Sequence, residues 1–110
     1  MVRADPVHGD RLMARLLLDV DTGVDDALAI AYLLAHDDAE IVGVCCTAGN
    51  VSVERVVQNT LSVLDLLGAP AMPVAVGSAI PLGGPIGSAE DVHGESGLGD
   101  AVLPDRKSVV

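Results

Sequence analysis

Residues 16–31 read LLLDVDTGVDDALAIA, and this stretch decides the fold because an acid-rich turn joins two elements in it. The run LLLDV at 16–20 is apolar apart from one acid, as is typical of a strand buried on both faces. Apolar residues then recur at helical spacing from Ala27 to Leu34. That spacing predicts a helix over about 26–36.

The pattern repeats further along the chain. IVGVCC at 41–46 predicts a second strand, and apolar residues spaced from Val53 to Leu64 predict a second helix that stops near Gly68. Residues 73–76 predict a third short strand. The order β-α-β-α-β predicts an α/β fold, as the N-terminal part of an open, mostly parallel sheet with flanking helices.

Two segments lack this periodicity. Residues 1–15 form a polar, charged leader, and the glycine-rich residues 77–99 are typical of a long functional loop or a disordered segment. We therefore divide the chain into a leader at 1–15 and one domain portion at 16–110. RKSVV at the end closes no further element, so we expect the sheet to be incomplete.

Composition excludes several classes of protein. Sixteen acidic residues against six basic ones give a net charge of -10, which repels phosphate backbones and argues against nucleic-acid binding. The leader has no apolar segment typical of secretion, and no apolar run is long enough to span a membrane. Cys45 and Cys46 are adjacent and cannot form an ordinary disulfide within a strand. These features predict a cytoplasmic protein without a membrane partner.

Four carboxylates lie within eight residues where the first strand meets the first helix: Asp19, Asp21, Asp25 and Asp26. Ligands bind at the carboxyl ends of strands in open parallel sheets. Crowded carboxylates repel one another unless a cation neutralises them, and calcium or magnesium suits oxygen ligands best. Taken singly, each acid also has an ordinary explanation, either as a turn residue or as a helix N-terminal acid.

A haloacid-dehalogenase-like phosphatase is a distant alternative for this segment. That family has an apolar strand followed by Asp-x-Asp and then Gly-Thr. Here Thr22 precedes Gly23, so the order is inverted, and the family lacks the following acid pair.

The segment resembles the signature of the inosine-uridine preferring nucleoside hydrolases, D-x-D-P-G-x-D-D-A. This chain has DVDTGVDDA at 19–27, with Thr22 in place of the usual proline, which loosens the turn without removing an acid. TAGNVSVE at 47–54 is similar to the family's second-strand turn, and VHGESGLG at 92–99 to its His-Gly-x-x-Gly-Leu loop. The resemblance covers about residues 16–99 and implies a Rossmann-like nucleoside hydrolase fold.

The resemblance also implies roles for individual residues. Asp21 and Asp26 correspond to calcium ligands, and Asp21 also to the base that deprotonates the attacking water. Asp25 and Asn50 correspond to ribose-binding residues, whereas Asp19 would support the metal from behind. A further correspondence places His93 near the nucleobase. Without the resemblance, the sequence favours Asn50 as a turn or cap residue and His93 as a polar surface residue.

The implied activity is hydrolysis of the N-glycosidic bond of purine or pyrimidine nucleosides to ribose and free base, in nucleoside salvage. Carboxylates stabilise the sugar cation that develops in such a reaction. Members of the family are longer and form homo-oligomers, so we expect this chain alone to bind calcium weakly and to be inactive. The alternative is a non-catalytic, vestigial or partner-associating fragment.

Overall fold

The computed structural model describes residues 12–80, 82–84, 95–99 and 101–103. The elements along the chain are β1 (Ala14–Val20), α1 (Val24–Leu34), β2 (Ala39–Cys46), α2 (Val53–Leu66) and β3 (Val74–Val76). This is the predicted β-α-β-α-β order. Only the positions of the element ends differ from the prediction.

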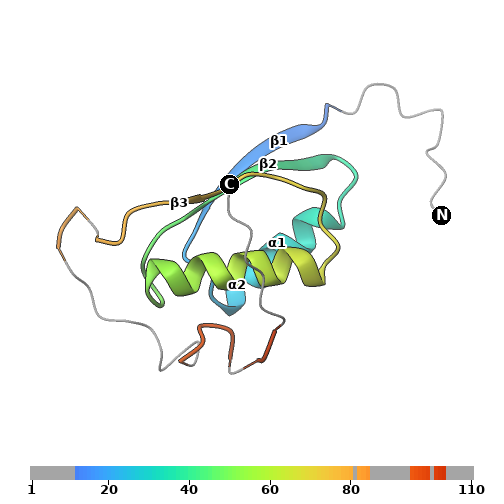
Figure 1. Ribbon diagram of the computed structural model, residues 1–110. Coiled ribbons are helices and arrows are strands. Elements are labelled where there is room, and N and C mark those ends of the chain that lie inside the picture. Colours follow the sequence, from blue (N-terminus) through green and yellow to red (C-terminus); the bar gives the residue numbers. More distant parts are fainter. Residues whose placement is uncertain (1–11, 81, 85–94, 100, 104–110) are drawn as a thin grey trace.

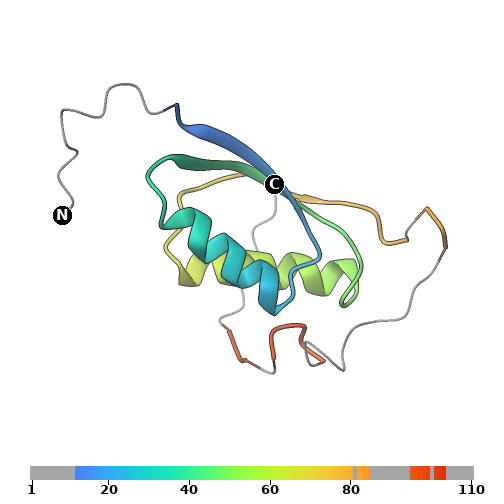
Figure 2. The ribbon, with the colours of Figure 1, turned by 180° about the vertical axis from the view of Figure 1, so that it is seen from behind.

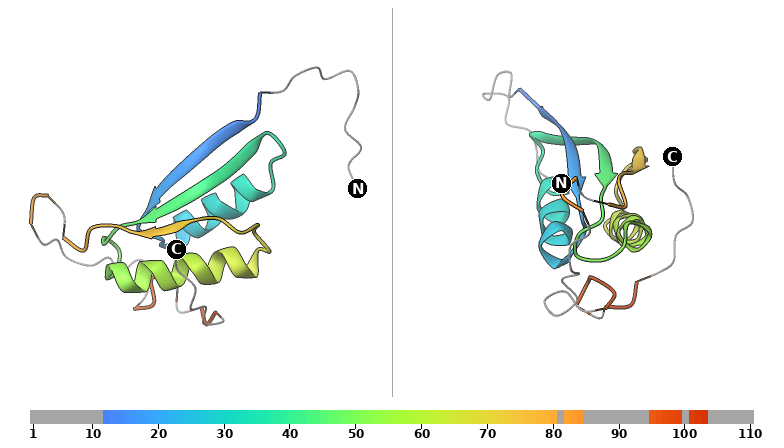
Figure 3. Two further views of the ribbon diagram at one scale, coloured as in Figure 1. Left: turned by 45° about the horizontal axis from the view of Figure 1, so that its top comes forward. Right: turned by 90° about the vertical axis from the view of Figure 1, so that its left-hand side faces the viewer.

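The three strands form one parallel sheet in the order β1-β2-β3. Both crossovers have the same sense, so α1 and α2 lie on the same face of the sheet (Figures 1 and 2). The two views in Figure 3 show the same two layers, with the strands in one and the helices in the other. The predicted parallel α/β arrangement is confirmed for the described residues.

The core lies between the sheet and the two helices. Its fully buried members include Ile30 of α1, Val44 and Cys46 of β2, and Val56 of α2. The α2 helix is the more deeply buried of the two, because it packs against β2 and β3 while the segment that includes Leu98 contacts the same cluster. The acid-rich turn therefore joins two elements, β1 and α1, that are packed into this core.

The opposite face of β1 is exposed among the described residues. The sheet register shifts between Leu16 and Leu17, and beyond the shift Leu17 and Asp19 lie exposed while Leu18 and Val20 face the helices. Leu17 is 74% exposed. The expectation that this strand is buried on both faces is wrong for the part of the chain that the structure describes, since no described element covers Leu17.

A glycine lies at one end of each helix. The α1 helix begins at Val24, two residues before the predicted start, because Gly23 has an extended backbone and serves as the N-cap. The α2 helix ends at Leu66, and Gly68 adopts a positive φ of 64° just beyond it, as predicted for a C-terminal stop. Ser52 caps the start of α2 by accepting a hydrogen bond from the Arg55 backbone amide at 3.4 Å.

Parts of the two irregular segments are outside the described residues. Residues 1–11 of the predicted leader, and residues 81 and 85–94 of the stretch 77–99, fall in this category. In the described ranges, no helix combines the length and the apolar character that a membrane span requires. Cys45 and Cys46 are both free thiols.

Candidate metal and sugar site

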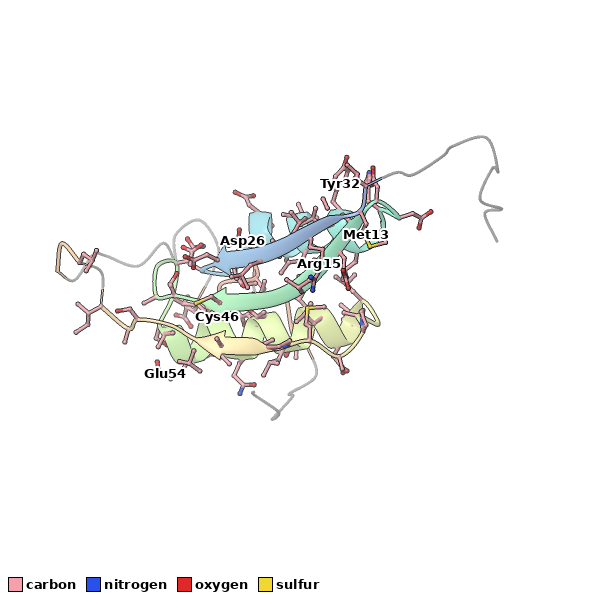
Figure 4. The ribbon with its side chains drawn as sticks, turned by 90° about the horizontal axis from the view of Figure 1, so that it is seen from above. Met13, Arg15, Asp26, Tyr32, Cys46 and Glu54 are labelled. Carbon is pink, nitrogen blue, oxygen red and sulfur yellow. The ribbon has the colours of Figure 1, made fainter. Side chains whose placement is uncertain are left out.

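The acid-rich turn lies at the carboxyl end of the sheet, between β1 and α1. Figure 4 places Asp26 and Cys46 at this end, where the arrowheads of β1 and β2 lie. Asp25 and Asp26 occupy the first turn of α1, where the positive end of the helix dipole stabilises negative charge. This position agrees both with the role of helix N-terminal acids and with the predicted metal site, so it does not by itself decide between them.

Asp21 is held by the loop that follows β2. The Asn50 backbone amide donates to Asp21 Oδ2 at 3.1 Å, and Asn50 Nδ2 donates to the Asp21 backbone oxygen at 3.3 Å. These two bonds link the ends of neighbouring strands and fix one oxygen of the carboxylate. The Asn50 side chain thus contacts Asp21 itself, a role that the sequence did not indicate.

Asp26 lies against the Asp21 side chain. Burial raises the pKa of the Asp26 carboxyl group above its ordinary value of 3.8, and the hydrogen bond and negative charge of Asp21 raise this pKa further. Hydrogen bonds from the backbone amides of Asp21 and Gly23 lower it in part. Two carboxyl groups this close favour either a shared proton or a bound cation.

The four acids do not form one cluster. Asp21 and Asp26 meet, Asp25 is exposed on α1, and Asp19 lies exposed on the outer face of β1, paired in register with Cys45. The described residues contain no group of three or more His, Cys, Asp or Glu side chains placed to bind one metal ion. His93 lies outside the described residues. Among the described residues, two carboxylates are thus brought together, and such hard oxygen donors could supply only part of the coordination shell of calcium or magnesium.

Thr22 connects the acid-rich turn to α2. It is fully buried, and its hydroxyl lies 2.7 Å from Thr60 Oγ1. Thr60 donates to the Val56 backbone oxygen at 2.8 Å, so its single proton is used and Thr22 must be the donor. The hydrogen bond offsets the loosening expected from the absence of proline at this position.

Thr60 accepts a second hydrogen bond, from Cys46 Sγ at 3.3 Å. Burial raises the pKa of the Cys46 thiol, which therefore retains the proton that it donates. In this way Thr60 bonds to the turn after β1 and to the end of β2. Every buried side-chain nitrogen or oxygen of the described residues has a hydrogen-bond partner.

The segment at 95–99 packs near the start of α1. Asn59 of α2 is buried and donates to the Ser96 backbone oxygen at 2.7 Å, next to Gly97 with its positive φ of 84°. A side chain added at Gly99 would lie 3.7 Å from Val24, the first residue of α1. Figure 2 shows this segment, coloured orange-red, on the side of the helices away from the sheet.

The fold and the site together define a class of protein: an α/β protein with paired carboxylates at the carboxyl end of a parallel sheet. A model of the family described as "Inosine-uridine preferring nucleoside hydrolase" matches residues 16–109. The chain belongs to this family.

Similar proteins include both short and long chains. An uncharacterized protein of Corynebacterium ammoniagenes is 42% identical over 86 residues, which are 78% of this chain and 94% of that protein. Uridine nucleosidase 1 of Arabidopsis thaliana is 42% identical over 91 residues, which are 82% of this chain but 27% of the plant enzyme. The chain thus spans between a quarter and a third of that relative's length.

The chain is also similar to part of solved nucleoside hydrolase structures. The purine-preferring ribonucleoside hydrolase from Gardnerella vaginalis superimposes with a TM-score of 0.81 at 38% identity, over 87% of this chain and 32% of that enzyme. One relative is named for uridine and this one for purines. Overall similarity over this part therefore does not assign the chain to either substrate class.

The sequence did not indicate two residues that shape the site, Gly49 and Thr60, or the buried hydrogen bond of Thr22. A side chain at Gly49 would collide with Asp21 Oδ2, and its Cβ would lie 2.9 Å from the Asp21 Cβ. Gly49 lies in the TAGN turn, and only its position next to Asn50 could have drawn attention to it. Thr60 lies within a helical pattern, and this pattern does not show that the Thr60 hydroxyl is buried and hydrogen-bonded to two other segments.

Proposed function

We propose that this chain forms the metal- and ribose-binding part of a calcium-dependent nucleoside hydrolase, which cleaves the N-glycosidic bond of purine or pyrimidine nucleosides to ribose and free base. The observation that supports it best is the contact between the Asp21 and Asp26 carboxyl groups at the carboxyl end of β1, in a member of this family. Asp21 and Asp26 would hold the calcium ion. When bound, calcium would acidify a coordinated water and orient the ribose hydroxyls.

The chain's own residues would perform the remaining tasks. Asp21 would take the proton from the attacking water, because the Asn50 amide donates to its Oδ2 and fixes the carboxylate beside Asp26. Asp25 is exposed beside the pair and would accept hydrogen bonds from ribose hydroxyls. Asn50 donates to Asp21 through its amide nitrogen, so its side-chain oxygen would be the atom that reaches the sugar.

Asp19 and His93 have less direct support. Asp19 lies at the end of β1 and would add negative charge behind the metal ligands. His93 would approach the nucleobase, since the nearby residues 95–99 reach the start of α1 beside the acids. We further propose a cytoplasmic role in nucleoside salvage, within a homo-oligomer.

Calcium takes six to eight oxygen ligands, and the described residues bring two carboxylates together. The chain by itself should therefore bind calcium weakly and release no detectable base from nucleosides. Such a chain would be a non-catalytic or partner-associating fragment of the family.

Calorimetric titration of calcium into the purified chain tests the proposal, with inosine and uridine hydrolysis assayed on the same sample. Asp21→Asn and Asp26→Asn should each remove the heat of binding. Asp37→Asn is the matched control, because Asp37 is an exposed acid at the far end of α1. Equal binding by all four proteins would refute the site, and a phospho-aspartate trapped on Asp19 would favour the phosphatase alternative instead.

A further inference from the structure

Gly49 lies directly against the Asp21 side chain. A Cβ built on Gly49 collides with Asp21 Oδ2 and lies 2.9 Å from Asp21 Cβ and 3.0 Å from Cγ. Real Cβ atoms essentially never make contacts as close as these. The backbone at Gly49 does not have a positive φ, so nothing in the backbone torsion itself requires glycine there. The close approach to Asp21 is the reason for glycine at this position.

The loop that contains Gly49 cannot easily retreat. On one side, the Ala48 amide donates to the Ser78 backbone oxygen at 3.1 Å. On the other, the Gly49 amide donates to the Val51 backbone oxygen at 3.2 Å, and Val51 is buried in the core. A side chain at position 49 would therefore be held in place against its neighbour.

The backbone of Asp21 is held as well. Val20 is a core residue, and Thr22 is fully buried with its hydroxyl bonded to Thr60. Rotation about χ1 moves the Asp21 carboxylate away from an added Cβ but leaves Asp21 Cβ in place, so the 2.9 Å contact between the two Cβ atoms also requires a small backbone shift. Both movements carry the carboxylate away from the Asn50 amide, which now donates to it.

We propose that Gly49 is a positioning residue: its missing side chain leaves the space in which the Asp21 carboxylate is held against Asn50 and Asp26. This inference rests on the proposed function for its consequence, because a displaced Asp21 would no longer present its carboxylate to the metal and the water. Changes to residues that orient metal ligands typically lower metal affinity about 10- to 100-fold.

The test is Gly49→Ala, compared with Gly43→Ala on β2, the strand that precedes this loop. A Cβ at Gly43 meets the exposed Leu17 side chain at 3.2 Å, and that side chain can move aside. In Gly49→Ala we expect calcium affinity to fall about 10- to 100-fold. The Asn50 amide proton should shift upfield and exchange faster in the calcium-free chain, because it loses its acceptor. Gly43→Ala should change neither property.

The two readouts separate this inference from the proposed function. If the unchanged chain binds no calcium, the proposed function fails, while the Asn50 amide still reports whether Gly49 positions Asp21. If Gly49→Ala leaves the Asn50 amide unchanged, the inference is wrong. Should Gly49→Ala fail to fold, the double variant Asp21→Gly, Gly49→Ala should fold again because the collision partner is gone, and continued failure to fold would also overturn the inference.

Discussion

Replacing Thr60 with valine should lower the free energy of unfolding by about 2 kcal/mol, although the two side chains have nearly the same shape. Thr60 is fully buried and accepts hydrogen bonds from Thr22 and Cys46. The valine leaves the buried Thr22 hydroxyl without an acceptor, and an orphaned buried donor costs about 1 to 3 kcal/mol. The weaker thiol donor adds little, and losing the bond from Thr60 to Val56 within the helix is nearly neutral.

Thr22→Val is the matched single variant. It removes the donor instead of the acceptor, and Thr60 keeps its bonds to Val56 and Cys46. We therefore expect a smaller loss, of about 1 kcal/mol. The double variant should lose at least about 1 kcal/mol less than the sum of the single losses, since it leaves no unpaired hydroxyl at either position.

Equilibrium unfolding in urea, in calcium-free buffer, measures these three free energies. Unchanged slopes of the unfolding free energy against urea would show that the folded and denatured states keep their compactness. The reasoning would be refuted if the losses added to within about 0.5 kcal/mol, because then Thr22 and Thr60 would act independently. A smaller loss for Thr60→Val than for Thr22→Val would refute the assignment of Thr22 as the donor.

Three further predictions concern single residues. Asp26→Asn should raise the free energy of unfolding by about 1 kcal/mol at neutral pH without calcium, because it removes repulsion from Asp21 that solvent partly screens. The folded state raises the pKa of Asp26 above 3.8, so the unchanged chain should lose stability as pH rises from 3.8 through the raised value. Asp26→Asn should lack that decline. If this variant is no more stable than the unchanged chain at pH 7, repulsion between Asp21 and Asp26 does not weaken the fold. Ser52→Ala should cost about 1 kcal/mol in urea unfolding, because it removes the N-cap of α2, and a Ser52→Asn control should retain most of the stability. Asn59→Ala should speed proteolytic cleavage near Ser96, because the 2.7 Å bond that holds this segment is lost; cleavage at an unchanged rate would show that the bond does not hold it.

The order of elements could be predicted because each one has its own local pattern. Apolar runs bounded by turn residues mark β1 and β2, and the apolar spacing from Val53 to Leu64 marks α2. The start of α1 was predicted two residues late, since the extended conformation of Gly23 depends on the turn around it. Local patterns identify elements more reliably than they identify their ends.

The division of the four acids was only partly predictable. Successive strand residues point to opposite faces, so the burial of Val20 implies that Asp19 faces outward. No local rule brings Asp26, in the first turn of a helix, against the Asp21 side chain. The contacts from Asp21 to the loop at 49–50 and from Thr22 to Thr60 join residues that lie 28 to 38 positions apart, so only the folded structure shows them.

The paired carboxylates weaken the fold that holds them, which is itself an argument for a functional role. Burial first, and then the hydrogen bond and negative charge of Asp21, raise the pKa of Asp26, so its charged form is disfavoured in this place. The structure nevertheless restrains Asp21 from two directions, through Asn50 and through the bond between its neighbour Thr22 and α2. The hydrogen bonds that restrain Asp21 stabilise the fold, but part of that gain is spent on holding two like charges together. In the proposed site this arrangement would become useful once a cation binds between the carboxylates, because the ligands would already be in place and little further ordering would be required.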